Sequence, residues 1–233
     1  MDMLPEKYTY LTVDICCILV PFLFSFHPRI KFYKQWKYFV LPSVLTAIFF
    51  LVWDIAFTRS GVWSFNPRYL IGASLFGLPM EEYLFFFIVP YCCVYTYYCM
   101  SKFFNFKRYT KAANEGAIFL ASVLMLVGLS HMARLYTSVT FLLLVVLLAF
   151  LVFKRVKYLP VFFVSFAMIL VPFFISNGIL TGSFIKEPVV GYNNKYNLGI
   201  RMFTIPIEDT FYGMLLMLMN VAGFEYLKRR KGH

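Results

Sequence analysis

Long apolar segments dominate the sequence and constrain its fold more than any other feature. We place seven of them at residues 8–26, 37–57, 79–99, 115–133, 137–153, 159–180 and 203–226. A helix needs roughly 20 predominantly apolar residues to cross the hydrocarbon core of a bilayer. The segments therefore predict an all-α, polytopic integral membrane protein with seven transmembrane helices. They leave room for a single transmembrane domain over residues 1–233 and for no separate soluble domain.

Composition excludes several other classes of protein. Of the 233 residues, 61% are hydrophobic and only 14% are charged, whereas soluble domains carry about 25% charged residues. The five cysteines lie in apolar runs without C-x-x-C spacing, and the three histidines are scattered. Neither a disulfide framework nor a metal cluster is therefore predicted. Because no G-x-G-x-x-G motif follows a predicted strand, we also expect no flavin or nicotinamide cofactor.

Basic residues are distributed unevenly between the loops. Fifteen of the 22 Lys and Arg residues fall within residues 29–37, 102–111, 154–157 and 228–231, which seven spans would place on one side of the membrane. An excess of basic residues marks cytoplasmic loops. The pattern predicts a multi-pass protein of the cell membrane with its N-terminus outside and its C-terminus in the cytoplasm. We interpret the net charge of +11 as this orientation signal with contacts to membrane lipid, not as a nucleic-acid site.

One short motif occurs twice. Residues 78–86 read LPMEEYLFF and residues 205–213 read IPIEDTFYG, so Pro79 and Pro206 each precede a pair of acids. The chain then divides into a first repeat (8–99), a linking helix (115–133) and a second repeat (137–226). Because an odd number of spans separates the two three-span units, both have the same orientation. We therefore expect a parallel 3+1+3 tandem repeat.

Six acids fall inside or at the edge of the apolar segments. They are Asp14, Asp54, Glu81, Glu82, Glu208 and Asp209. A carboxylate at the bilayer centre costs roughly 2.5–3.5 kcal/mol on insertion scales, and no Lys or Arg lies deep in a span to pair with one. Their neutral form is therefore favoured. A structural role stays open for the pairs, because acids in a first helical turn satisfy free N–H groups. We interpret Asp14 as structural, since the second repeat has no acid at the matching place.

Aromatic side chains accompany these acids in the outer zone of the predicted membrane domain. They are Trp53, Trp63, Phe65, Phe85, Phe86, Phe211 and Tyr212. Each one alone is typical of an interfacial aromatic belt or of helix packing. Together with neutral carboxyls, they suit acid-initiated carbocation chemistry, because a protonated acid donates to an alkene and each ring stabilises the cation by about 0.5–2 kcal/mol. Exclusion of water keeps the cation from being captured as an alcohol.

At these residues the sequence resembles the membrane-embedded lycopene cyclases. This family includes paired small subunits, fused tandem chains and the cyclase domain of fungal bifunctional enzymes. The resemblance rests on the two P-x-E-[ED] motifs, on Trp53-Asp54 near the end of the second segment and on the GVWSF sequence of residues 61–65. It covers nearly the whole chain, which is similar to the fused form. Asn177 stands near where the first half has Asp54, so we expect the two halves to be inequivalent.

The resemblance implies conversion of the acyclic ψ ends of lycopene, or of a related carotenoid, to β-ionone rings. An acid protonates C2, the C5=C6 double bond closes onto the C1 cation, and a base removes the C6 proton, so the reaction is redox-neutral. The expected acid/base set is Glu81 or Glu82 with Glu208 and Asp209, and Asp54 orients or recharges one of them. The expected substrate-binding residues are Pro79, Pro206 and the seven aromatic residues named above. Membrane lipid and other carotenoid-pathway enzymes are the further partners considered.

Three other interpretations remain open from the sequence. A small transporter with three-one-three parallel repeats would use membrane acids for proton coupling, although these acids lie to one side of the bilayer. A retinal protein needs a buried lysine, which residues 203–226 lack. A non-catalytic assembly subunit is also compatible with the sequence. Conversion of red lycopene to an orange-yellow pigment distinguishes a cyclase from a carrier.

Overall fold

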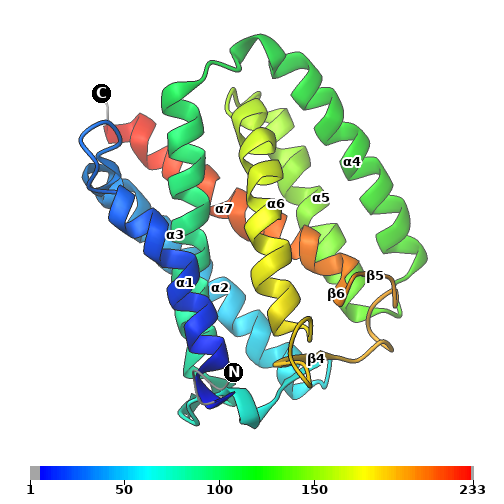
Figure 1. Ribbon diagram of the computed structural model, residues 1–233. Coiled ribbons are helices and arrows are strands. Elements are labelled where there is room, and N and C mark those ends of the chain that lie inside the picture. Colours follow the sequence, from blue (N-terminus) through cyan, green and yellow to red (C-terminus); the bar gives the residue numbers. More distant parts are fainter. Residues whose placement is uncertain (1–5, 232–233) are drawn as a thin grey trace.

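The computed structural model describes residues 6–231, and helices dominate this part of the chain (Figure 1). Each of the seven predicted segments coincides with one helix. The helices are α1 (Thr9–Phe24), α2 (Trp36–Arg59), α3 (Met80–Phe103), α4 (Thr110–Ser130), α5 (Leu135–Phe153), α6 (Leu159–Leu180) and α7 (Ile207–Lys231). The helical prediction is therefore confirmed. Residues 1–5 and 232–233 of the expected single domain lie outside the described residues.

Six of these helices, α1 to α6, are long and apolar enough to cross a membrane. The remaining helix, α7, carries Glu208 and Asp209 in its first turn and the buried Asn220 further along. Figure 1 shows α7 running obliquely through the middle of the bundle, where it packs against α2, α3, α5 and α6. Residues 214–218 of α7 are buried. A central helix covered by protein tolerates more polar residues than a helix that faces lipid, which accounts for the lower hydropathy of α7.

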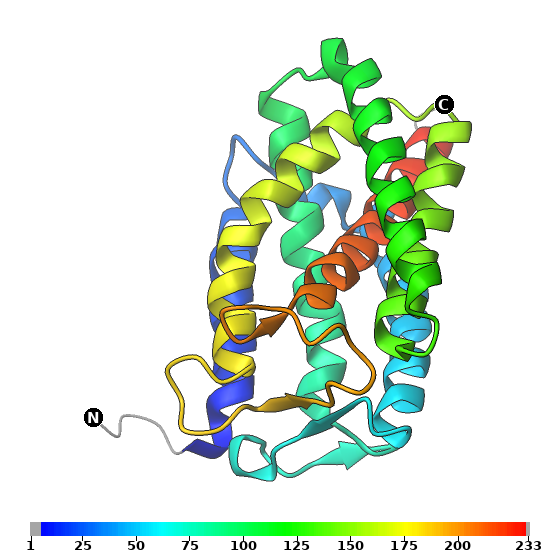
Figure 2. The same cartoon turned by 90° about the vertical axis from the view of Figure 1, so that its right-hand side faces the viewer.

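The connections between the helices gather at two ends of the bundle. The strands and the start of α1 lie at the lower end in Figure 1, and α7 ends at the upper end. Figure 2 shows the same separation from the side, with α7 crossing between α6 and the α4–α5 pair. The α1–α2, α3–α4 and α5–α6 connections lie at the upper end. The basic segments of the chain therefore share one end of the bundle.

Short strands at the lower end modify the all-α expectation. In one antiparallel ribbon, β1 (Trp63–Phe65) pairs with β4 (Val190–Tyr192), so that the α2–α3 loop joins the α6–α7 loop. Ser64 lies opposite Gly191, and a Cβ placed on Gly191 would lie 3.3 Å from Ser64 Oγ. The described strands have two or three residues each, which is too short for alternating hydrophobicity to reveal them.

A matched hairpin precedes both α3 and α7. The hairpins are β2 (Ser74–Leu75) with β3 (Leu78–Pro79), and β5 (Arg201–Met202) with β6 (Ile205–Pro206). The backbone N–H of Met80 donates to the carbonyl of Ala73 at 3.0 Å, and the N–H of Ile207 donates to the carbonyl of Ile200 at 3.0 Å. Each pair of acids therefore enters its helix from a loop of the same construction.

A close approach of two backbones joins α2 and α7. Gly223 of α7 faces Pro42 of α2, and a Cβ built on Gly223 would lie 2.5 Å from Pro42 Cβ. Val221 and Phe224 beside it are fully buried. Small residues let transmembrane helices pack closely. The absence of a side chain at Gly223 therefore sets the separation of these two helices.

We expect Gly223→Ala to lower the free energy of unfolding by about 1–3 kcal/mol, because the added methyl group overpacks the α2–α7 contact. Unfolding of the purified protein in detergent measures this loss. The control is Gly116→Ala in α4, where no atom lies within 4 Å of the added Cβ and alanine favours a helix. Equal stability of the two variants would contradict the packing role of Gly223.

Candidate active site

The first acid of each pair faces the loop that precedes its helix. Glu81 Oε1 accepts a hydrogen bond from the backbone N–H of Ile71 at 2.7 Å. Glu208 Oε1 accepts one from the N–H of Leu198 at 2.7 Å and another from Thr137 Oγ1 at 2.6 Å. Both carboxyls are fully buried. These two acids therefore fix, through hydrogen bonds, the loop segment that precedes each hairpin.

The second acid of each pair faces the first helix of its own half. The hydroxyl of Tyr10, in α1, donates to Glu82 Oε2. The hydroxyl of Tyr136, in α5, donates to Asp209 Oδ1 at 2.6 Å. Both tyrosines are 1% exposed. The same tyrosine-to-carboxyl contact thus occurs once in each half of the chain.

Asp209 has more hydrogen-bond donors than Glu82. Asn177 Nδ2 donates to Asp209 Oδ2 at 2.9 Å, and the hydroxyl of Tyr192 donates to the same oxygen at 2.8 Å. With the bond from Tyr136, both oxygens of Asp209 are occupied. Hydrogen bonds of this kind favour the ionised form of a carboxyl group. The two acids therefore have different chemical environments, as Asn177 led us to expect.

Asp54 in α2 is the third carboxyl of this region. Its Oδ1 accepts a hydrogen bond from Trp63 Nε1 at 2.6 Å. Its Oδ2 is buried and has no hydrogen-bond partner among residues 6–231. Asp54 lies close enough to Glu82 for their charges to interact. An unpaired buried carboxyl oxygen is uncommon in a folded protein, and Glu81 and Glu208 each have one as well.

Aromatic rings enclose Tyr212, which lies between these acids. The centroid of its ring is 4.9 Å from that of Phe50, 5.1 Å from Trp53, 6.2 Å from Tyr136 and 6.3 Å from Trp63. All four neighbouring side chains are buried. The contacts are edge-to-face, which is a favourable arrangement for aromatic rings. The cluster therefore has walls made of π systems.

Tyr212 lies between three of the buried acids. Trp63, which donates to Asp54, and Tyr136, which donates to Asp209, both pack against its ring, and the charge of Glu82 also acts on it. The three acids come from α2, α3 and α7, so the region is built by both halves of the chain. They are between 1% and 9% exposed. Three carboxyls thus converge on one dry, aromatic centre.

Tyr192 connects this centre to the lower surface of the molecule. Burial and the neighbouring Asp209 charge raise the pKa of Tyr192 well above the usual range of a phenol, so its hydroxyl stays protonated and donates. Together with Trp63, Tyr192 lines a hollow of about 340 Å³. The hollow is completed by Gly61, Ser64, Gly191 and Asn193. Trp63 and Tyr192, which donate hydrogen bonds to Asp54 and Asp209, therefore also line a hollow at the surface.

Some of the predicted substrate-binding residues lie beside this centre. Trp53, Trp63 and Tyr212 belong to it, and Phe86 joins it through Phe50, with ring centroids 5.9 Å apart. Phe85 contacts the edge of Phe86 at 5.4 Å. The first half of the chain therefore contributes most of the aromatic wall.

Other predicted residues lie elsewhere. The ring of Phe211 packs on Phe141 of α5 at 5.0 Å, and Phe65 lies in the β1–β4 ribbon. Pro79 and Pro206 end the hairpin strands β3 and β6. Pro79 is the N-cap of α3 and has an extended backbone. Each proline therefore directly precedes the helix that carries its pair of acids.

Sequence reasoning missed the tyrosine donors. Tyr10 and Tyr136 both begin the pattern Tyr-x-[Thr/Ser]-Val, at residues 10–13 and 136–139. A search for this second repeated motif would have found them. No comparable signal marks Tyr192 or Phe50, which reach the centre only through tertiary packing. Asp14, interpreted as structural from the sequence, is buried in α1.

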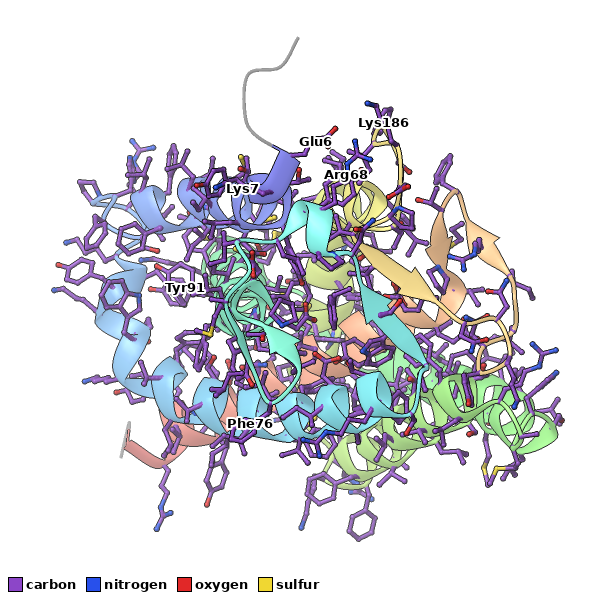
Figure 3. All side chains as sticks on the ribbon, turned by 90° about the horizontal axis from the view of Figure 1, so that it is seen from below. Glu6, Lys7, Arg68, Phe76, Tyr91 and Lys186 are labelled. Carbon is purple, nitrogen blue, oxygen red and sulfur yellow. The ribbon has the colours of Figure 1, made fainter. Side chains whose placement is uncertain are left out.

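A surface ion pair secures the start of α1 near this region. Arg68 Nε and Glu6 Oε2 lie 2.5 Å apart and join the short helix Pro67–Tyr69 to the residues before α1. Figure 3 shows both side chains at the same edge of the lower face, near Lys186. The hydrogen bond that Arg68 donates to Glu6 raises the pKa of Arg68 above its usual value. Solvent screens such a pair, so it orients the segment and adds little stability.

Comparison with known proteins identifies the family of this fold and site. The model of the lycopene cyclase family matches residues 7–100 and residues 133–227. The chain belongs to the lycopene cyclase family. The resemblance noted in the sequence is therefore confirmed. Each matched segment of this family member contains one acid pair, its tyrosine donor and its hairpin.

Two fungal proteins are also similar to this family member. The bifunctional lycopene cyclase/phytoene synthase of Podospora anserina is 31% identical over 91 residues, or 39% of the chain. The protein of the same description from Phaeosphaeria nodorum is 34% identical over 64 residues, or 28% of the chain. These matches cover only 15% and 11% of the two relatives. No solved structure matches the chain.

We expect Trp63→Phe to destabilise the protein by about 1–3 kcal/mol more than packing loss alone, because it leaves Asp54 without its donor. Trp53→Phe is the matched control, since Trp53 Nε1 has no partner among the described residues. Both substitutions remove an indole from the same cluster. Unfolding in detergent compares the two variants, and equal losses would contradict a stabilising Trp63–Asp54 bond.

Proposed function

We propose that this protein is a carotenoid cyclase that converts acyclic ψ end groups of lycopene, or of a related carotenoid, to β-ionone rings. The observation that carries the proposal is the convergence of Asp54, Glu82 and Asp209, all buried, around the half-buried ring of Tyr212. The family and the names of the two fungal relatives support the same substrate class. This family does not favour the transporter interpretation.

Asp209 is the fixed negative charge in this mechanism. Three donors hold its two oxygens, so it is oriented and less available to exchange protons. A preorganised anion in a dry site stabilises a developing carbocation. The rings around Tyr212 add cation–π attraction. Together they stabilise positive charge that the apolar polyene cannot stabilise itself.

Glu82 and Asp54 perform the proton transfers. Glu82 has one phenolic donor, so its other oxygen is available to protonate C2 of the terminal double bond. The C5=C6 electron pair then closes onto the C1 cation, which leaves a cation at C5. Asp54, whose Oδ2 is unpaired, takes the C6 proton, and the C5=C6 double bond of the β ring forms. Asp54 returns this proton to Glu82, so the cycle is redox-neutral and balanced.

Glu81 and Glu208 have a different role in this proposal. Each binds a backbone N–H of the preceding loop and thereby fixes the hairpin before its helix. They position Glu82 and Asp209 without exchanging protons. The paired spacing thus combines one anchoring acid and one acid that faces the substrate.

The proposed membrane arrangement is a parallel 3+1+3 repeat in one domain, with α4 as the link and α7 as the seventh span. The recurrence of the tyrosine, loop and hairpin contacts supports it. So does the packing of α2 on α7, which parallels the packing of α6 on α3. The basic segments at one end support a cytoplasmic C-terminus in the cell membrane. The acids then lie near the outer surface, and lipid supplies the carotenoid from the side.

We expect Glu82→Gln to reduce ring formation at least about 100-fold, because an amide cannot serve as the proton donor. Glu81→Gln is the matched control at the adjacent position. Its side-chain oxygen still accepts from Ile71, so most activity remains. Cells that accumulate lycopene report both variants by pigment colour, and chromatography identifies the ring isomer. Full activity of Glu82→Gln, with equal membrane insertion, would refute this assignment.

Ring formation by the purified protein is expected without added flavin or nicotinamide, since no electrons are transferred overall. The assay follows lycopene consumption by absorbance in detergent or lipid, with and without each cofactor. A strict requirement for a reduced flavin would count against the mechanism.

A further inference from the structure

Asp14 is a buried carboxyl that the mechanism above does not use. It lies in α1 and is 2% exposed. Its Oδ2 is buried and has no hydrogen-bond partner among the described residues. Burial of an unsatisfied carboxyl oxygen carries a large desolvation cost. Such a group calls for an explanation, and its neighbours provide one.

The position of Asp14 relates it to Glu82. Asp14 follows Tyr10 by four residues in α1, so both side chains lie on one face of the helix about 6 Å apart. The hydroxyl of Tyr10 donates to Glu82, and α1 packs along α3. The charges of Asp14 and Glu82 lie within interaction range. Asp14 therefore lies one turn of α1 beyond Tyr10, the residue that donates a hydrogen bond to Glu82.

The surroundings of Asp14 contain acids and weakly polar groups. They are Tyr10 and Cys17 of α1, Glu81, Glu82 and Cys92 of α3, and Ser176 of α6, which contacts Cys17. Within residues 6–231, the three salt bridges involve other acids, namely Glu6, Glu115 and Glu225. With no basic partner, Asp14 rests as a neutral acid and becomes an anion only when it gives up a proton to a neighbour.

The second half of the chain provides an internal comparison. Tyr136 donates to Asp209 as Tyr10 does to Glu82. One turn after Tyr136 lies Thr140, which is also buried with an unpaired hydroxyl. The tyrosine–acid contact thus occurs in both halves, but the additional carboxyl occurs only in the first. This difference indicates that the extra acid serves Glu82 specifically.

We propose that Asp14 is a proton-holding partner of Glu82, a proposal that rests on the cyclase function above. After Glu82 protonates the alkene, the O–H bond of Asp14 breaks, a new O–H bond forms on Glu82, and the negative charge moves to Asp14. The C6 proton collected by Asp54 later returns through Glu82 and restores the neutral Asp14. No oxidant or external proton is required. Asp14 acts through Glu82 and is therefore a positioning residue.

The test uses the full chain, purified in detergent, with lycopene as substrate. We expect Asp14→Asn to lower kcat about tenfold with little change in KM, which is a modest part of the effect of a general acid. The alkaline limb of the kcat–pH profile should also move, because Glu82 then loses one of the neighbouring acids with which its titration is coupled. Asp14→Glu should restore both properties. Thr140→Val, the matched control in the other half, should retain wild-type kcat.

A second variant separates chemistry from folding. Asp14→Leu replaces an unpaired buried carboxyl with an apolar side chain of similar size, so the unfolding temperature should stay the same or rise while kcat falls. A lower unfolding temperature with an unmoved pH profile would make Asp14 structural and overturn the proposal. So would wild-type kcat and pH profile in Asp14→Asn. If the unaltered protein forms no rings, it is the proposed cyclase function that fails.

Discussion

A carboxyl group withdrawn from water must find its hydrogen-bond donors inside the protein, and this requirement organises the lower end of the molecule. Glu81 and Glu208 draw in the loop backbone at Ile71 and Leu198. Their neighbours in sequence instead draw the first helix of each half toward the start of the third, through a tyrosine hydroxyl. Hydrogen bonds to buried carboxyl groups therefore position both the loops and the helices around the site.

The helices follow from local properties of the sequence, and the strands do not. Long apolar segments indicate helices, and six of the seven are also long and apolar enough to cross a bilayer. The repeated P-x-E-[ED] motif likewise indicated two related entries into α3 and α7. The β1–β4 ribbon depends on residues far apart in the chain, such as Trp63 and Tyr192. No periodicity within a three-residue strand encodes that pairing.

The same distinction applies to the site. The sequence indicated the acidic residues and the inequivalence marked by Asn177, but adjacent helix positions differ by 100° in direction. Only the placement of neighbouring helices separates a carboxyl that binds a loop from one that faces Tyr212. Asp14 shows the converse, since its lack of a counterpart in the second half argued for a structural role. In the role proposed for Asp14, the packing of α1 on α3 makes that asymmetry functional.

The β1–β4 ribbon has a consequence for how such a molecule assembles. Asn66 donates its backbone N–H to Val189, and Asn193 donates its own to Val62, so each half completes the hydrogen bonding of the other. Made as separate polypeptides, the halves would each expose an open strand edge, which invites pairing with unintended neighbours. The tether through α4 turns this encounter into an intramolecular one at high effective concentration. Covalent fusion thus favours the pairing of unlike halves over the pairing of like halves.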